Sequence, residues 1–300
     1  MSEHSPAWFT DALAAPAGTG STEVDGVPIA YRTWGEPGGP GVLLVHGGAA
    51  HSRWWDHVAP LLVEAGRRVV ALDLSGHGDS GRAPGYDLHR WAGEVLAVAR
   101  HAGVGPRPTV VGHSMGGFVT LTAALQHGYE LAGAVVVDSP VRDRSPEEIA
   151  ARQQRAFGPT RVYPDRPTAL ARFRTVPEQD GDLPYVRAHI AEHSLRPVDG
   201  GWSWKFDRRI FGGIGLTPGE LTRPGCRVAL LRAEHGLVPA DMGEMVVDRM
   251  GRAAPVVEIP GAGHHVMIDQ PLALVTALRT LLADWEYSLP VRPREPLGVE

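Results

Sequence analysis

The sequence predicts an α/β protein in which a mostly parallel sheet is wrapped by helices. The first observation is a series of short apolar runs, such as Gly41-Val42-Leu43-Leu44-Val45, each of which ends at turn residues. Runs of this length suit strands that are buried on both faces of a parallel sheet. The second observation is that helix-like segments separate these runs, and this alternation is typical of a parallel sheet covered by helices.

The strands and helices follow one another along most of the chain. Residues 22–34 alternate around Asp25-Gly26, which is a hairpin turn signal. We expect strands at 41–45, 68–73, 109–112, 134–138, 228–231 and 256–259. We expect helices at about 53–65, 86–102, 116–127, 240–250 and 271–285.

Composition indicates a globular protein without strongly charged partners. The 300 residues are 43% hydrophobic and 21% charged, with a formal net charge of −5 and no basic stripe. Cys226 is the only cysteine, which excludes internal disulfides and a cysteine-based zinc site. The first ten residues lack a signal-peptide pattern, and no apolar stretch is long enough to span a membrane. We therefore expect a cytoplasmic enzyme without nucleic-acid or membrane partners, whose oligomeric state the sequence leaves open.

The alternation stops between residues 141 and 223, and this break defines the expected domains. The segment is rich in arginine, proline and aromatic residues and reads as broken helices. It lies between two predicted strands, so we interpret it as a helical cap (lid) over the carboxyl edge of the sheet, where such sheets bind ligands. Residues 19–140 and 224–300 then form the core domain, and residues 1–18 are expected to be a loose arm.

The strongest functional motif is Gly112-His113-Ser114-Met115-Gly116, which matches G-x-S-x-G. An apolar strand precedes it and a helix pattern follows it, as a nucleophile elbow requires. The glycines keep side chains out of a sharp turn that lifts the serine, and the helix N-terminus directs N–H groups at developing negative charge. This context predicts Ser114 as a nucleophile, whereas we interpret His113 as a packing residue.

Four motifs together resemble the α/β-hydrolase superfamily. They are the His46-Gly47-Gly48 loop, the segment 73–80 (DLSGHGDS), the elbow at 112–117 and the turn 261–264 (GAGH). The resemblance covers about residues 22–140 and 224–286. It implies the α/β-hydrolase fold, with an eight-stranded, mostly parallel sheet and a helical lid.

The resemblance also implies an oxyanion hole and a general base. The loop after the first buried strand and the residue after the nucleophile supply the N–H groups in this superfamily, which points to Gly48 and Met115. His264 stands where relatives carry the catalytic histidine, and its ordinary pKa lies near neutrality, as a general base needs. His265 competes for this role, but the family spacing favours His264.

The acid departs from the usual family pattern. Relatives place an aspartate in a G-x-x-D pattern after the penultimate strand, but Gly236 occupies that position here. Some relatives, including a subgroup of haloalkane dehalogenases and certain lactone hydrolases, keep the acid after the strand that follows the elbow, which corresponds to Asp138. Glu234 is the alternative, because its longer side chain could reach back. We favour Asp138, and either carboxylate could fix the histidine tautomer and stabilise the imidazolium.

One further motif suggests a metal but is discounted. Residues 189–193 (HIAEH) fit H-x-x-E-H, a zinc-protease pattern that would place two histidines on one helix face. Short patterns of this kind arise by chance, and this one lies within the expected cap. We therefore predict no metal and no cofactor.

These features predict a serine hydrolase that cleaves a small carboxylic ester or lactone with an apolar portion under the cap. The serine excludes the aspartate-nucleophile mechanisms of the family's dehalogenases and epoxide hydrolases. Three alternatives stay open: carbon–carbon bond hydrolysis, cofactor-free oxygenation and a ligand receptor with little turnover. Fold-level analogy fixes the reaction class at best, so the substrate is left open.

Overall fold

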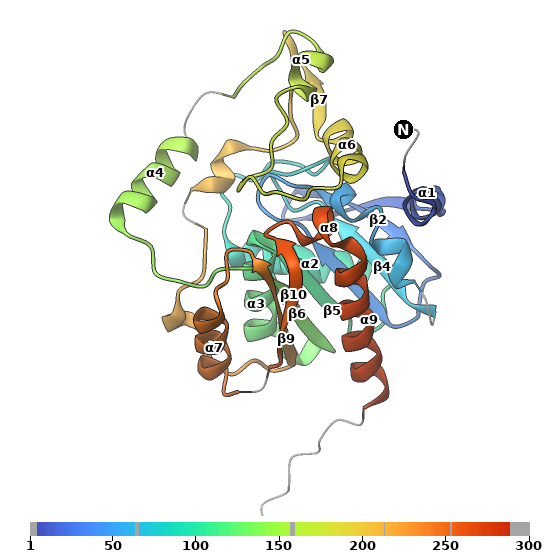
Figure 1. Ribbon diagram of the computed structural model, residues 1–300, viewed down its shortest axis with the longest axis vertical. Coiled ribbons are helices and arrows are strands. Elements are labelled where there is room, and N and C mark those ends of the chain that lie inside the picture. The colour runs from blue at the N-terminus through green and yellow to red at the C-terminus, as the bar shows by residue number, and fades with distance from the viewer. Residues whose placement is uncertain (1–4, 64–65, 157–159, 213, 253, 289–300) are drawn as a thin grey trace, which may run out of the picture.

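An eight-stranded sheet forms the centre of the molecule (Figure 1). The computed structural model describes residues 5–63, 66–156, 160–212, 214–252 and 254–288. The strands lie in the order β1-β2-β4-β3-β5-β6-β9-β10. Strand β2 pairs antiparallel with both β1 and β4, and all other neighbours are parallel. The strands are β1 (Gly18–Val24), β2 (Val27–Trp34), β3 (Gly41–Val45), β4 (Arg68–Leu72), β5 (Thr109–His113), β6 (Gly133–Val137), β9 (Arg227–His235) and β10 (Val256–Gly263).

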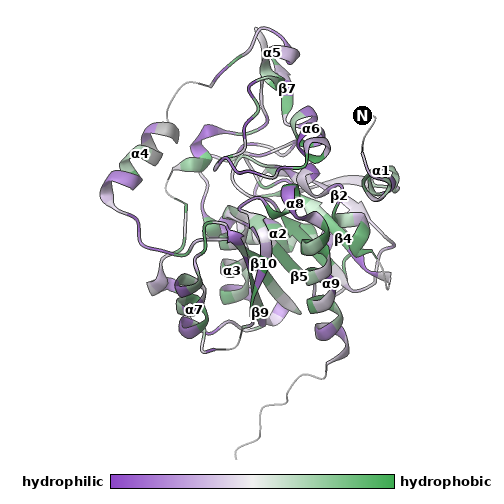
Figure 2. Ribbon diagram, in the orientation of Figure 1, coloured by the Kyte–Doolittle hydropathy of each residue, from purple (hydrophilic) through white to green (hydrophobic). Residues whose placement is uncertain are grey.

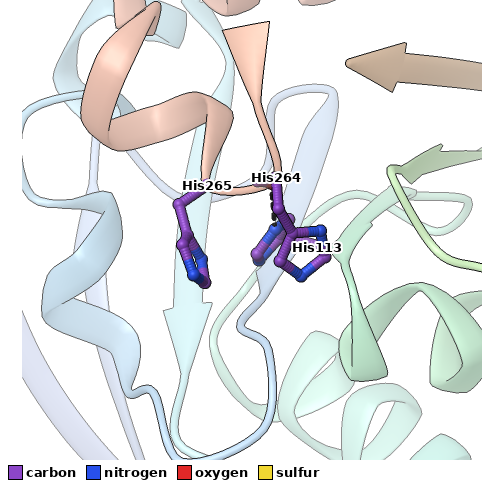
Figure 3. A group of neighbouring side chains, drawn as sticks. All are labelled: His113, His264 and His265. Carbon is purple, nitrogen blue, oxygen red and sulfur yellow. Dashed lines mark hydrogen bonds between the residues drawn. The ribbon is translucent and has the colours of Figure 1, made fainter. Parts of the chain in front are cut away.

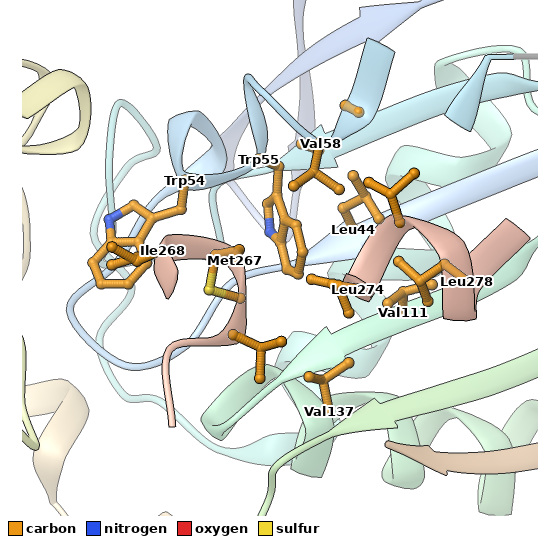
Figure 4. Packing of buried hydrophobic residues seen from close by; sticks show 14 of the residues in the cluster. Leu44, Trp54, Trp55, Val58, Val111, Val137, Met267, Ile268, Leu274 and Leu278 are labelled. Carbon is orange, nitrogen blue, oxygen red and sulfur yellow. The ribbon is translucent and has the colours of Figure 1, made fainter. Parts of the chain in front are cut away.

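The two faces of the sheet carry separate hydrophobic cores because successive side chains of a strand point to opposite sides. Leu44 of β3 and Val111 of β5 pack with α9 (Pro271–Tyr287) and α8 (Val266–Asp269), as Figure 4 shows. Leu43 and Val110 instead pack with α2 (Leu88–His101) and α3 (Met115–His127). The central strands of the sheet are accordingly coloured as hydrophobic in Figure 2. Helix α7 (Ala240–Arg249) packs against the β6–β9 end of the sheet. Among the described helices, none has the length and apolarity needed to cross a bilayer.

Two local expectations are wrong. The segment 53–65 is not one α-helix but two 3-10 turns, η1 (Ser52–Trp55) and η2 (Ala59–Leu62), with residues 64–65 outside the described part. Pro60 lacks the N–H that a continuous helix would donate to Asp56, so the helix cannot run through. The expected loose arm also contains a helix, α1 (Ala7–Ala14), because Phe9 is buried against Tyr185, with ring centroids 4.8 Å apart.

The segment 141–223 lies across the carboxyl edge of the sheet in Figure 1. It holds α4 (Pro146–Ala156), α5 (Arg166–Leu170), α6 (Pro184–His193) and the 3-10 turns η5 (Arg208–Phe211) and η6 (Pro218–Glu220). It is not purely helical, because β7 (Leu195–Val198) and β8 (Gly201–Trp204) form an antiparallel hairpin. The turn Asp199-Gly200, with Gly200 at φ +84°, is the hairpin signal that the sequence interpretation missed.

Candidate active site

Ser114 stands on a strained turn between β5 and α3. Its backbone has φ +55° and ψ −118°, a conformation that side chains other than glycine rarely adopt. The turn is held on both sides, since Ser114 donates its N–H to Val137 (2.9 Å) and accepts the N–H of Gly117 (3.0 Å). A Cβ at Gly116 would lie 2.4 Å from the carbonyl oxygen of His46, so the elbow can approach β3 only with glycine there.

The structure brings Ser114, His264 and Asp138 into one hydrogen-bonded chain. His264 Nε2 lies 3.0 Å from Ser114 Oγ, and His264 Nδ1 lies 2.7 Å from Asp138 Oδ2. A carboxylate can only accept, so Nδ1 carries the proton and Nε2 is free to accept the hydroxyl proton. The side chains of His264 and Asp138 are 3% and 0% exposed, which shields their interaction from water.

The position of Asp138 explains the glycine that replaces the usual family aspartate. Asp138 follows β6 with φ +44°, and its Oδ1 and Oδ2 accept the N–H groups of Ala233 (3.2 Å) and Leu237 (2.7 Å). A Cβ on Gly236 would lie 2.4 Å from both carboxylate oxygens. The carboxylate of Asp138 therefore fills the space that a side chain at position 236 would need.

Glu234, the alternative acid, lies apart from His264. It is exposed, and its Oε2 accepts the N–H of Gly261 at 2.7 Å. This contact joins the end of β9 to the bulge in β10, so Glu234 shapes the loop before His264 without touching its ring.

The two expected oxyanion residues are neighbours. Met115 is the first residue of α3, and a Cβ on Gly48 would lie 3.6 Å from its Sδ. The Gly48 loop is fixed by His46, whose Nδ1 donates to the carbonyl of Gly47 (2.7 Å) and whose Nε2 accepts the N–H of Leu74 (3.1 Å). Ala49 follows with φ +60°, so the loop turns sharply beside the nucleophile.

Two further histidines surround His264 (Figure 3). His113 donates from Nε2 to the carbonyl oxygen of His264 at 2.8 Å, so it holds the main chain of His264 in addition to packing in the core. Nε2 of His265 lies 3.2 Å from the carbonyl oxygen of Pro177. Burial lowers the pKa of His113 well below its usual value, and burial lowers the pKa of His265 to about 3, so both rings are neutral at pH 7.

The H-x-x-E-H motif holds its two histidines apart from the nucleophile. His189 and His193 lie on α6 with ring centroids 4.6 Å apart. His189 Nε2 is engaged by Asp56 Oδ2 at 3.0 Å, in a cluster that also contains Arg32. Among the described residues, no third metal ligand lies with this pair. The contact between His189 and Asp56 instead joins α6 to the end of η1.

Sequence interpretation missed two residues that hold the His264 loop. Asp269 Oδ2 accepts the N–H of Gly263 at 2.5 Å, and Gln179 Oε1 accepts the N–H of His265 at 2.7 Å. Asp269 follows the histidine pair by four residues, but nothing in its sequence context marks it as a loop anchor. Gln179 comes from the segment 141–223 and is joined to the site only by tertiary structure.

Comparison with known proteins identifies the class that this fold and site define. A model described as Alpha/beta hydrolase family matches residues 42–278, which is most of the chain. The chain belongs to the α/β-hydrolase family, as the motifs predicted, and it has that family's mostly parallel eight-stranded sheet.

Individual relatives agree with a hydrolase. The chain is 28% identical to Esterase Rv0045c of Mycobacterium tuberculosis, over 85% of this chain and 86% of that protein. It is 25% identical to sn-1-specific diacylglycerol lipase ABHD11 of Mus musculus, over 89% of each. The structure of E-2-(acetamidomethylene)succinate hydrolase superposes with a TM-score of 0.76 at 21% identity, over 89% of this chain and 100% of that one, which shows the shared fold. The chain is therefore an enzyme of the α/β-hydrolase class.

Proposed function

We propose that the chain is a serine hydrolase that cleaves a carboxylic ester or lactone through an acyl-enzyme. The observation that carries this proposal is the continuous Ser114–His264–Asp138 chain, with contacts of 3.0 and 2.7 Å. Aspartate-nucleophile relatives lack a hydroxyl at the elbow, whereas the hydroxyl of Ser114 is already within reach of its base.

The mechanism follows from the proton positions. Ser114 Oγ attacks the carbonyl carbon of the substrate while His264 Nε2 accepts the hydroxyl proton. The N–H groups of Gly48 and Met115 receive the oxyanion, and each such donor is worth about 10²–10³ in rate. His264 then protonates the departing alkoxide, and a water that it deprotonates releases the acid from Ser114. Asp138 keeps the Nδ1 proton in place and stabilises the imidazolium.

The segment 141–223 supplies the proposed cap and the substrate chamber. A hollow of about 500 Å³ is lined by Thr160, Arg161, Tyr163, Ser203, Trp204, Phe206 and Arg208. Phe206 contacts Phe211, whose ring lies 3.9 Å from the Cβ position of Gly48. This aromatic path leads from the hollow to the oxyanion loop and suits a small substrate with an apolar body. The esterase and lipase among the relatives support ester substrates.

Steady-state hydrolysis of short p-nitrophenyl esters tests the proposal. We expect Ser114→Ala and His264→Ala to abolish turnover and Asp138→Asn to impair it strongly. Glu234→Gln is the matched carboxylate control, because its side chain bonds only the loop, and it should stay close to wild type.

The same assay has outcomes that reject the proposal. If Ser114→Ala is as active as wild type, then no acyl-enzyme forms at this serine. If the wild type binds esters but does not turn them over, ester hydrolysis is rejected. Carbon–carbon hydrolysis, oxygenation and a receptor role are then tested in its place.

A further inference from the structure

Three buried imidazoles, those of His113, His264 and His265, are neighbours (Figure 3), and His264 also contacts Ser114. His113 ends β5, and His264 and His265 follow β10, so two separate strand ends supply the cluster. One ring nitrogen from each histidine lies within 4.8 Å of the other two, and among the described residues this is the one group of histidine, cysteine and acidic side chains with such spacing.

Each ring already has an oxygen partner that fixes its tautomer. His264 Nδ1 donates to Asp138, His113 Nε2 donates to the carbonyl of His264, and His265 Nε2 points to the carbonyl of Pro177. Carbonyl and carboxylate oxygens can only accept, so these nitrogens carry the protons. Histidines that bind metals show this arrangement, in which one ring nitrogen donates to an oxygen and the other is left for the ion.

Two of the three remaining ring nitrogens have no hydrogen-bond partner. Nδ1 of His113 and Nδ1 of His265 are buried and have no hydrogen-bond partner among the described residues. An unpaired buried acceptor costs about 1–3 kcal/mol. The rings of His113 and His265 have centroids 5.6 Å apart, so a ligand between them could satisfy both acceptors. The third nitrogen, His264 Nε2, has only the Ser114 hydroxyl at 3.0 Å.

We propose that His113, His264 and His265 form an inhibitory site for Zn²⁺, which binds at the resting enzyme and occupies the nitrogen that the general base uses. Three histidine nitrogens and one oxygen, from Ser114 or water, make a tetrahedral set that zinc prefers. Zn–N bonds of about 2.0–2.1 Å place ligand nitrogens roughly 3.4 Å apart, so the rings move closer when the ion binds. That movement lowers the affinity below that of a structural zinc site and makes the inhibition reversible. The inhibitory effect rests on the proposed function, whereas zinc binding itself does not.

The donor set also predicts which ions bind. Imidazole nitrogen suits Zn²⁺ and Cu²⁺, whereas Mg²⁺ and Ca²⁺ prefer oxygen ligands. We therefore expect Zn²⁺ to inhibit and Mg²⁺ to have no effect.

A zinc titration against a chromophoric chelator tests binding without any substrate. The wild type should bind one Zn²⁺ per chain. His265→Phe keeps an aromatic ring but removes both nitrogens, and it should weaken binding at least about 100-fold, since loss of even an outer partner costs about 10–100-fold. His193→Phe is the matched control, because His193 lies on α6 outside the cluster, and its affinity should equal that of wild type.

Ester hydrolysis then tests inhibition. Zn²⁺ should stop wild-type turnover and a chelator should restore it, whereas His265→Phe should need at least about 100-fold more zinc for the same inhibition. The proposal is overturned if the wild type binds no zinc, or if His265→Phe and His193→Phe share one binding midpoint. If His265→Phe does not fold, His113→Asn makes the same comparison. If no ester is hydrolysed, the proposed function fails while the chelator titration still decides whether the zinc site exists.

Discussion

Replacing Asp138 with asparagine removes one negative charge from beside His264 and keeps a side chain of the same shape. The carboxylate accepts N–H groups at both oxygens: Ala233 at Oδ1, and Leu237 and His264 at Oδ2. An asparagine that keeps its oxygen at the Oδ2 position preserves two of these three bonds and the His264 tautomer. It removes the charge that faces the imidazolium, and it replaces the acceptor of the Ala233 N–H with an amide NH₂ group.

The size of the loss follows from that geometry. Two opposite charges about 4 Å apart interact by about 4 kcal/mol at an effective dielectric constant near 20. Because every 1.36 kcal/mol changes a rate tenfold, kcat/KM should fall by about 10³. KM should change little, since Asp138 is buried behind His264 and does not reach the substrate.

The measurement is kcat/KM with p-nitrophenyl esters, paired with the rate at which a fluorophosphonate labels Ser114. Labelling reports nucleophile activation even where the ester is a poor substrate, and both rates should fall together. Glu234→Gln removes a charge of the same sign from the neighbouring loop and serves as the control. A loss of less than tenfold in Asp138→Asn, or an equal loss in Glu234→Gln, would refute Asp138 as the triad acid.

Two further predictions concern buried carboxylates. Gly236→Ala should lower kcat/KM by about 100-fold, because the new Cβ would lie 2.4 Å from the Asp138 carboxylate and displace it. In the Asp138→Ala background, where that carboxylate is gone, adding Gly236→Asp should instead raise kcat/KM at least about tenfold. If Gly236→Ala alone leaves kcat/KM unchanged, the steric argument is wrong. Burial raises the pKa of Glu94 from 4.5 to about 7, so the native state keeps a proton that the unfolded chain loses, and stability falls as pH rises through this window. Glu94→Gln should therefore raise the free energy of unfolding, measured by urea titration, by about 3 kcal/mol near pH 8 and by little near pH 4. An equal gain at both pH values would show that the protonation of Glu94 is not linked to stability.

The sequence predicted the sheet and the elbow well because these features are local. Buried parallel strands are apolar throughout, and the elbow needs glycine at fixed positions, so both leave a pattern in consecutive residues. The hairpin β7–β8 is hard to recognise in the sequence because each of its strands has only four residues, and the surrounding segment has the pattern of broken helices. The apolar pattern at 53–65 favours a helix, but Pro60 interrupts it because proline has no N–H to donate. The loop anchors Gln179 and Asp269 left no pattern at all, since their partners are backbone groups brought near by folding.

The placement of Asp138 shows how a missing residue can carry information. In the sequence, Gly236 reads only as the absence of an expected aspartate, and it left Asp138 and Glu234 both open. In the structure, the absence has a physical reason, because a side chain at position 236 and the carboxylate of Asp138 require the same space. The two N–H groups from Ala233 and Leu237, on either side of that glycine, hold the carboxylate there. The loop in which relatives are expected to carry the acid here donates two hydrogen bonds to Asp138. The carboxylate comes from the end of β6, and the backbone of this loop fixes its position.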